Sequence, residues 1–172
     1  MAEASSLTSS STPAMTANRG DAPPGKLLKY TSYLYRNPSL TEAEFHEHWR
    51  SRHARLPIAA MKKHGIVKYS QYHCTRATRE LARPSSEGRK AANRHVQYDM
   101  FEYDAVVQIW VEDIDAIAKM GGEDVFVDKI FADEEYLFDR KRCHVLVGWE
   151  EDILVDGKVL IPGYDEQTEG RQ

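Results

Sequence analysis

One stretch of the sequence constrains the fold more than any other: residues 41–64, TEAEFHEHWRSRHARLPIAAMKKH. At about 100° per residue, four apolar side chains of this stretch fall on one narrow stripe of a helix. They are Phe45, Trp49, Leu56 and Ala60. His53 lies on the same stripe, and His46 lies at its edge. The pattern predicts a helix that packs on a core and carries a histidine on its buried face.

The ends of this helix have their own signals. Thr41 is a suitable N-cap, and Glu44 three residues later completes a capping box. Pro57 interrupts the pattern, so we expect a kink or a second short helix after Leu56. Gly65 is typical of the residue that follows a helix.

Strand and helix patterns alternate along the rest of the chain. Four segments read as strands because they are rich in β-branched and aromatic residues. They are residues 27–36, 66–76, 105–111 and 143–149. Two helical segments separate the last two strands, one starting at Asp113 and ending near Gly122, the other covering residues 123–138. This mixture predicts an α+β domain.

The run LLKYTSYLYRNPSLTEAEFHEHWRSRHARL, a strand followed by EFHxxWRxxHxxL, resembles the EthD-type family of dimeric α+β barrel proteins. The resemblance covers residues 26–152. It implies a ferredoxin-like βαββαβ protomer that dimerises through its sheets and encloses a pocket. Similar members include fungal-type polyketide-tailoring decarboxylases, dehydratases and cyclases, which work without a metal or an organic cofactor.

The chain divides into four parts by composition. Residues 1–25 are rich in Ser, Thr, Ala and Pro, which predicts a disordered tail. Residues 26–152 form the domain, and residues 77–103 within it form a basic insert that is either a lid or a solvated surface. Residues 153–172 form a C-terminal arm, in which Asp156-Gly157 predicts a hairpin that docks and contributes to a dimer contact.

Composition also limits the partners. The 172 residues fit one domain, and the formal net charge of -4 gives no general attraction to nucleic acid. No apolar run approaches the roughly 20 residues of a membrane span. Cys74 and Cys143 should lie on opposite edges of the sheet, about 14 Å apart, which is beyond disulfide reach. Free thiols and the absence of a secretory h-region predict a cytoplasmic protein.

The implied topology gathers polar side chains at one end of the sheet. His53, His73 and Asp104 are the catalytic candidates: His53 as proton donor or base, and His73 as a partner oriented by Asp104. Further side chains at the same end of the sheet are candidates for substrate binding. They are Tyr33, His46, Trp49, Tyr72, Trp110 and His144.

Each candidate also has a structural interpretation. His53 would then be a core histidine bonded to a carbonyl, His73 and Asp104 a structural pair at the rim, and His144 an exposed residue. The tyrosines would be packing residues. A metal site is disfavoured because His46 and His48 diverge by about 200° on a helix.

The sequence therefore predicts a cofactor-free lyase that decarboxylates or dehydrates a polycyclic aromatic polyketide acid. The alternatives are a polyketide cyclase, a cofactor-free anthrone-type monooxygenase and a non-catalytic small-molecule-binding dimer. The expected partners are an aromatic small molecule and a second copy of the chain, without nucleic acid, membrane or metal.

Overall fold

The computed structural model describes residues 17–92 and 100–164. The N-terminal half contains β1 (Leu28–Leu34), α1 (Glu42–Ser51), η1 (His53–Arg55), α2 (Ile58–Lys63), β2 (Lys68–His73) and α3 (Arg76–Ala92). The C-terminal half contains β3 (Ala105–Val111), α4 (Asp115–Gly121), η2 (Phe126–Ile130), α5 (Phe131–Leu137), η3 (Arg140–Arg142), β4 (His144–Trp149), β5 (Leu154–Val155) and β6 (Lys158–Val159).

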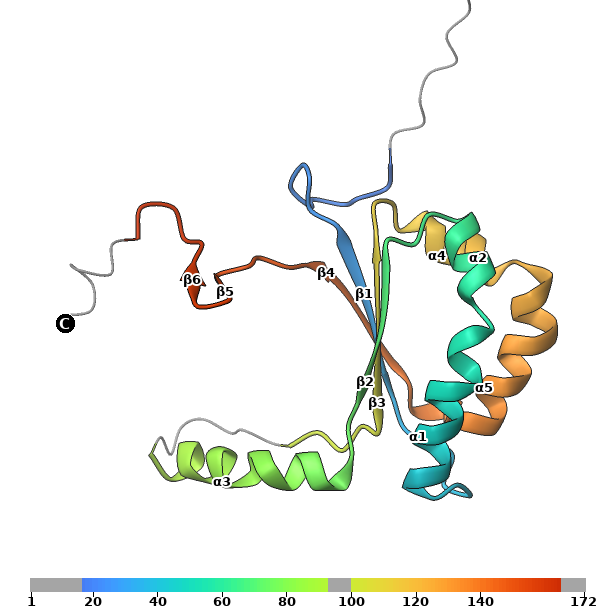
Figure 1. The fold of residues 1–172 in the computed structure, drawn as a ribbon, viewed down its shortest axis with the longest axis horizontal. Coiled ribbons are helices and arrows are strands. Elements are labelled where there is room, and N and C mark those ends of the chain that lie inside the picture. Colours follow the sequence, from blue (N-terminus) through green and yellow to red (C-terminus); the bar gives the residue numbers. More distant parts are fainter. Residues whose placement is uncertain (1–16, 93–99, 165–172) are drawn as a thin grey trace, which may run out of the picture.

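The sheet has the expected ferredoxin-like topology. Its four strands pair in the order β2-β3-β1-β4, and every pair is antiparallel. Helices α1, α2, α4 and α5 cover one face of the sheet, and α3 and the C-terminal hairpin project on the other side (Figure 1). The prediction of an α+β, ferredoxin-like βαββαβ protomer is confirmed.

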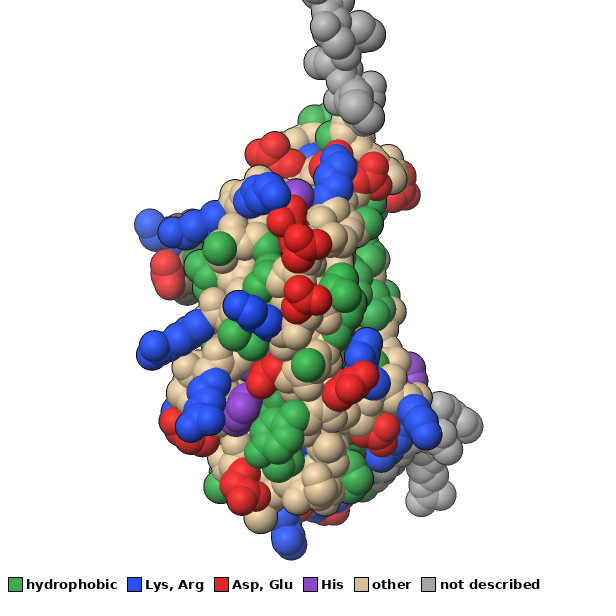
Figure 2. All heavy atoms as spheres, turned by 90° about the vertical axis from the view of Figure 1, so that its right-hand side faces the viewer, with side chains coloured by type: hydrophobic (Ala, Val, Ile, Leu, Met, Phe, Trp, Pro, Cys, Tyr) green, Lys and Arg blue, Asp and Glu red, His purple; other side chains and the backbone are tan. Residues whose placement is uncertain are grey.

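The core lies between the sheet and the helix layer. Phe45 and Trp49 are fully buried and pack with Leu34 of β1 and Ala105 of β3. A second cluster, which includes Leu28, fills the other end of the layer. The outer face of the helix layer mixes cationic and anionic side chains among hydrophobic ones (Figure 2), as a solvated face does.

The central helix begins where the sequence predicts and a second short helix follows Pro57 as expected, but the first helix already ends at Ser51. The Glu44 N–H donates to Thr41 Oγ1 at 3.2 Å, and the Thr41 N–H donates to Glu44 Oε2 at 2.8 Å, which confirms the capping box. After Arg52 the chain tightens into η1, and Pro57 then starts α2. The early end of α1 matters because it places His53 in the separate tight turn η1.

The insert after β2 begins with a helix. α3 continues through Pro84, and its first turn is capped because the Thr78 N–H donates to Thr75 Oγ1 at 3.1 Å. Arg79 donates to the Cys74 and Tyr103 carbonyls at 2.7 and 2.9 Å, and these bonds tie the start of α3 to the sheet. Residues 93–99 of the expected lid and the side chain of Arg89 lie outside the described residues.

The crossing from β3 to β4 contains an unexpected π-helix. The Asp115 N–H donates to Asp113 Oδ1 at 2.9 Å as α4 begins, in line with the predicted start. The predicted second helix is instead η2, a π-helical turn, followed by α5. π-helical turns are often found at functional sites, because the extra residue shifts the side chains that follow it.

Neither end of the described chain is an unstructured tail. The segment expected to be disordered up to residue 25 bonds to the domain from Asn18 onward: the Ile114 N–H donates to the Asn18 carbonyl at 3.0 Å. The predicted hairpin forms, with Asp156 and Gly157 at φ of 49° and 77°. Residues 1–16 and 165–172 lie outside the described residues. Among the described helices none could cross a membrane.

Candidate active site

A cavity of about 400 Å³ lies between the sheet and the segment from α4 to α5. Its wall is mostly aliphatic and aromatic, with contributions from β1, β3, η2 and α5. The side chains with polar atoms along the wall are Tyr30, Ser32, His53, Glu134, Arg140 and Cys143. An apolar cavity of this size with a few convergent polar groups is typical of a small-molecule site.

His53 is the buried imidazole of this cavity, with 5% of its surface exposed. Its Nδ1 lies 2.8 Å from Asp133 Oδ2, and Asp133 Oδ1 lies 2.7 Å from His48 Nε2. A carboxylate accepts hydrogen bonds only, so both histidines donate to Asp133. The proton of neutral His53 is therefore on Nδ1, and Nε2 keeps its lone pair for a substrate.

Burial lowers the pKa of His53 below its ordinary value, and the hydrogen bond to Asp133 partly opposes that effect. His53 is therefore neutral at pH 7. A neutral imidazole that is held by a carboxylate and has a free Nε2 can act as a general base.

Glu134, next to Asp133 in α5, lines the same cavity. Burial raises the pKa of its carboxyl above the ordinary value, and Arg140 partly opposes the effect. The cavity thus contains two titratable groups whose pKa values burial shifts in favour of the neutral form: the pKa of the His53 imidazole is lowered and that of the Glu134 carboxyl is raised.

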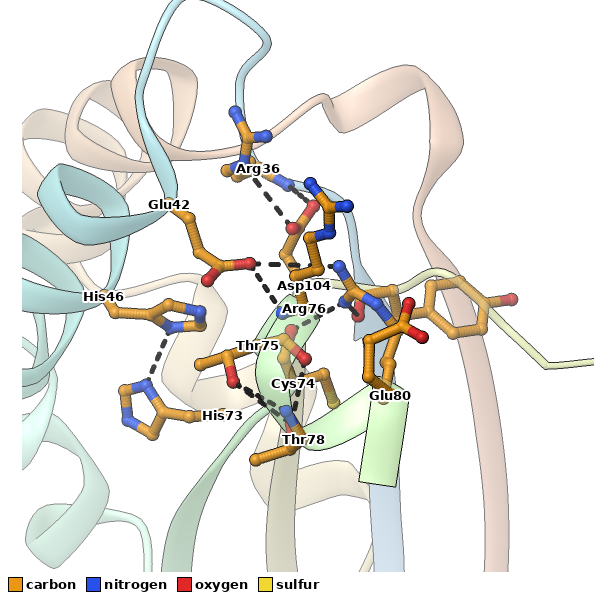
Figure 3. Close-up of polar contacts among 12 residues, drawn as sticks. Arg36, Glu42, His46, His73, Cys74, Thr75, Arg76, Thr78, Glu80 and Asp104 are labelled. Carbon is orange, nitrogen blue, oxygen red and sulfur yellow. Dashed lines mark hydrogen bonds and ion pairs between the residues drawn. The ribbon is translucent and has the colours of Figure 1, made fainter. Parts of the chain in front are cut away.

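His73, the second catalytic candidate, pairs with another histidine. His73 Nδ1 lies 2.8 Å from His46 Nδ1, as Figure 3 shows. Burial lowers the pKa of both imidazoles. One Nδ1 donates and the other accepts, so the pair stays together only while at least one ring is neutral. Trp49 packs against His73 with ring centroids 4.7 Å apart.

Asp104, the expected partner of His73, bonds to a different residue. Asp104 Oδ2 accepts from the Arg36 N–H at 3.0 Å, and Oδ1 lies 3.4 Å from Arg36 Nε (Figure 3). The predicted His73–Asp104 pair is therefore not formed between these two described residues. Asp104 instead holds the chain that leaves β1.

The remaining candidates lie on the opposite face of the sheet. Tyr33 and Tyr72 line a smaller pocket of about 240 Å³ beside α3. Trp110 Nε1 donates to Glu150 at 2.8 Å, and two lysines lie over the Trp110 ring. His144 Nδ1 lies 3.3 Å from the Tyr103 hydroxyl at the edge strand. Of the predicted candidates, all of which the structure describes, His53 alone lines the cavity of about 400 Å³.

Comparison with known proteins identifies the family. The model of the EthD domain matches residues 37–141 of the chain. The chain belongs to the EthD family. Dehydratase aurZ from Gibberella zeae is 31% identical over 137 residues, which cover 80% of this chain and 86% of that protein. Decarboxylase claH from Passalora fulva is 24% identical over 160 residues, which cover 93% of this chain and 97% of that protein.

Among solved structures, the EthD family protein from Bacillus halodurans has a TM-score of 0.45 and 14% sequence identity, over 73% of this chain and 99% of that one. The EthD match of the present chain spans α1 through α5. It includes His48, His53, Asp133 and Glu134, whereas the cavity residues Tyr30, Ser32 and Cys143 lie outside the matched range. The C-terminal arm lies outside the match.

Two residues of the cavity region, Asp133 and Glu134, were not among the predicted candidates. Both lie in the predicted helix 123–138, and charged residues of an amphipathic helix are expected on its solvent-exposed face. One pattern in the sequence could have indicated them. They follow VFVDKIF, a run with too many apolar residues for a helix that is buried on one face only. No group of three or more His, Cys, Asp or Glu in residues 17–92 and 100–164 could hold a metal ion.

Proposed function

We propose that this EthD domain is a cofactor-independent lyase that removes water or carbon dioxide from a polycyclic aromatic polyketide acid. One observation carries the proposal: His53 is buried in an apolar cavity with Nδ1 held by Asp133 at 2.8 Å. This arrangement supports proton transfer at Nε2. The relatives named dehydratase and decarboxylase support the same class of reaction.

The chemistry of such substrates requires little beyond proton transfer. Dehydration of a β-hydroxy ketone begins when a base removes the acidic proton next to the carbonyl. Decarboxylation of an ortho-hydroxy acid needs a proton delivered to the ring carbon. In both reactions the developing charge is spread over a phenolic or enolic system, which hydroxyls such as those of Tyr30 and Ser32 can stabilise. The aromatic walls suit flat fused rings, and their apolar surface keeps water away.

We also propose that the protein is a homodimer, as the resemblance to dimeric α+β barrels implies. The open face of the sheet lies between α3 and the hairpin arm (Figure 1). Leu146 of β4 and Leu154 of the arm are 60% and 62% exposed, and a single copy leaves them in water. A second copy would bury them. A monomer in sedimentation at micromolar concentration would contradict this proposal.

The proposed reaction can be tested with the purified, exhaustively chelated protein. The probes are a β-hydroxy-tetralone, which loses water to give a naphthol, and an ortho-hydroxy naphthoic acid, which loses carbon dioxide. We expect turnover of at least one probe without added metal, flavin or nicotinamide, followed by mass spectrometry of the product. Turnover that requires a metal or a nucleotide cofactor would contradict the proposal.

A further inference from the structure

We propose that Glu134 is a second catalytic residue of the cavity, which donates a proton to a leaving hydroxyl while His53 removes the carbon-bound proton. This assignment makes the reaction a dehydration and the substrate a β-hydroxy ketone fused to an aromatic ring. The inference rests on the proposed function above, because it assigns a partner to His53 in the same cavity.

The position of Glu134 on α5 separates it from its neighbours. Successive residues of a helix are about 100° apart, so Asp133, Glu134 and Glu135 point in three directions. Asp133 contacts His48 and His53. Glu135 lies on the surface, 3.5 Å from Arg140 Nη1. Glu134 lines the cavity, and among the described residues no hydrogen bond or ion pair engages its carboxyl.

The surroundings of Glu134 favour its protonated form. Burial raises the pKa of its carboxyl, the charge of Asp133 raises it further, and Arg140 opposes both effects. The titratable groups that face this region come from every neighbouring element. They are Tyr30 of β1, His53 of η1, Tyr69 of β2, Asp133 of α5, Arg140 of η3 and Cys143 before β4. Burial thus favours a protonated carboxyl at Glu134 and an unprotonated imidazole at His53, and this is the combination that general acid and base catalysis requires.

The elimination balances with these two groups. His53 Nε2 takes the proton from the carbon next to the carbonyl, and the electron pair of that C–H bond forms the C=C bond. The C–O bond of the β-hydroxyl breaks, and its electron pair leaves on the oxygen, which takes the proton of Glu134 and departs as water. The imidazolium of His53 then loses its extra proton to solvent, and the carboxylate of Glu134 regains one.

This acid distinguishes the two reactions of the proposed lyase. Hydroxide is a poor leaving group, so loss of water gains from an acid placed at the oxygen. Loss of carbon dioxide needs a proton donor at the ring carbon but no base, whereas loss of water uses both a base at the C–H bond and an acid at the leaving hydroxyl. The presence of both His53 and Glu134 in the lining of one cavity therefore favours dehydration.

The test compares Glu134→Gln with Glu135→Gln on two probes. The first probe is the β-hydroxy-tetralone, and the second is the same tetralone with acetate in place of the hydroxyl, which leaves as a stable anion. We expect Glu134→Gln to lower kcat for the hydroxyl probe by roughly 10²–10³-fold and to leave the acetate probe nearly unchanged. Glu135→Gln, the neighbouring surface carboxylate, should behave as the natural protein on both. Equal losses on both probes, or no loss on either, would overturn the assignment.

A second measurement needs no variant. For the natural protein, kcat/KM of the hydroxyl probe should fall as pH rises through the pKa of Glu134, because the acid is lost. The acetate probe should lack this alkaline decline. The same decline on both probes would overturn the assignment even if Glu134→Gln fails to fold. If His53→Gln is inactive on both probes while Glu134→Gln is normal, the role of Glu134 is wrong but the proposed lyase site stands. If both variants are fully active, the proposed lyase site itself is wrong.

Discussion

Replacing His53 by Gln is expected to lower kcat by roughly 10²–10⁴-fold, because the amide keeps a similar volume but cannot transfer a proton in the transition state. The measurement is steady-state turnover of the β-hydroxy-tetralone, with circular dichroism to verify folding. His64→Gln is the matched control: His64 also contacts a carboxylate, Glu123 Oε1 at 2.6 Å, but does not line the cavity.

The pH dependence of the natural protein follows from the same residue. A base must be neutral, so kcat/KM should fall as pH decreases through the pKa of His53. Because burial lowers that pKa, the decline should begin below the ordinary histidine value of about 6.5. A folded His53→Gln protein with near-normal turnover would make His53 part of the scaffold, and proton transfer would then fall to the His46–His73 pair.

Replacing Asp133 by Asn is expected to lower kcat by roughly 10²–10⁴-fold with little change in KM, because the amide no longer holds His53 in the tautomer with a free Nε2. Asp133 also raises the pKa of His53. Its loss should therefore move the acid decline of kcat/KM to lower pH, a shift that a merely structural role would not produce.

His48→Gln is the control for this variant, since it removes the other contact of Asp133, at 2.7 Å, and leaves the pair of Asp133 with His53 intact. We expect a much smaller loss of kcat from it. An Asp133→Asn protein with unchanged kcat and an unchanged acid decline would contradict the proposed dyad.

Local signals in the sequence predict the local structure well. The capping box at Thr41 and Glu44, the kink at Pro57 and the hairpin at Asp156-Gly157 each depend on a few neighbouring residues with one favoured geometry. The apolar stripe of the central helix, in turn, decides which of its side chains face the sheet. For this reason the amino-acid sequence alone predicts the order of the four sheet strands along the chain and the burial of His53, but it does not predict α3 in the insert.

The partners of the site residues do not follow from such patterns. Asp133 is 80 residues from His53, and no local pattern indicates which residue of a distant helix will meet that imidazole. The predicted His73–Asp104 pair failed for a simpler reason. His73 lies opposite Ala105, so Asp104 is displaced by one residue toward Cys74. A shift of one residue changes the face of the sheet on which a side chain lies.

A crystal structure with the bound naphthol product would test the central claim most directly. We expect electron density for the two rings in the cavity between the sheet and α5, with the naphthol oxygen within hydrogen-bonding distance of the polar wall and the ring edge facing His53 Nε2. Density in the smaller pocket lined by Tyr33, Tyr72 and Arg79, with the larger cavity empty, would contradict the assignment of His53, Asp133 and Glu134 as the active site.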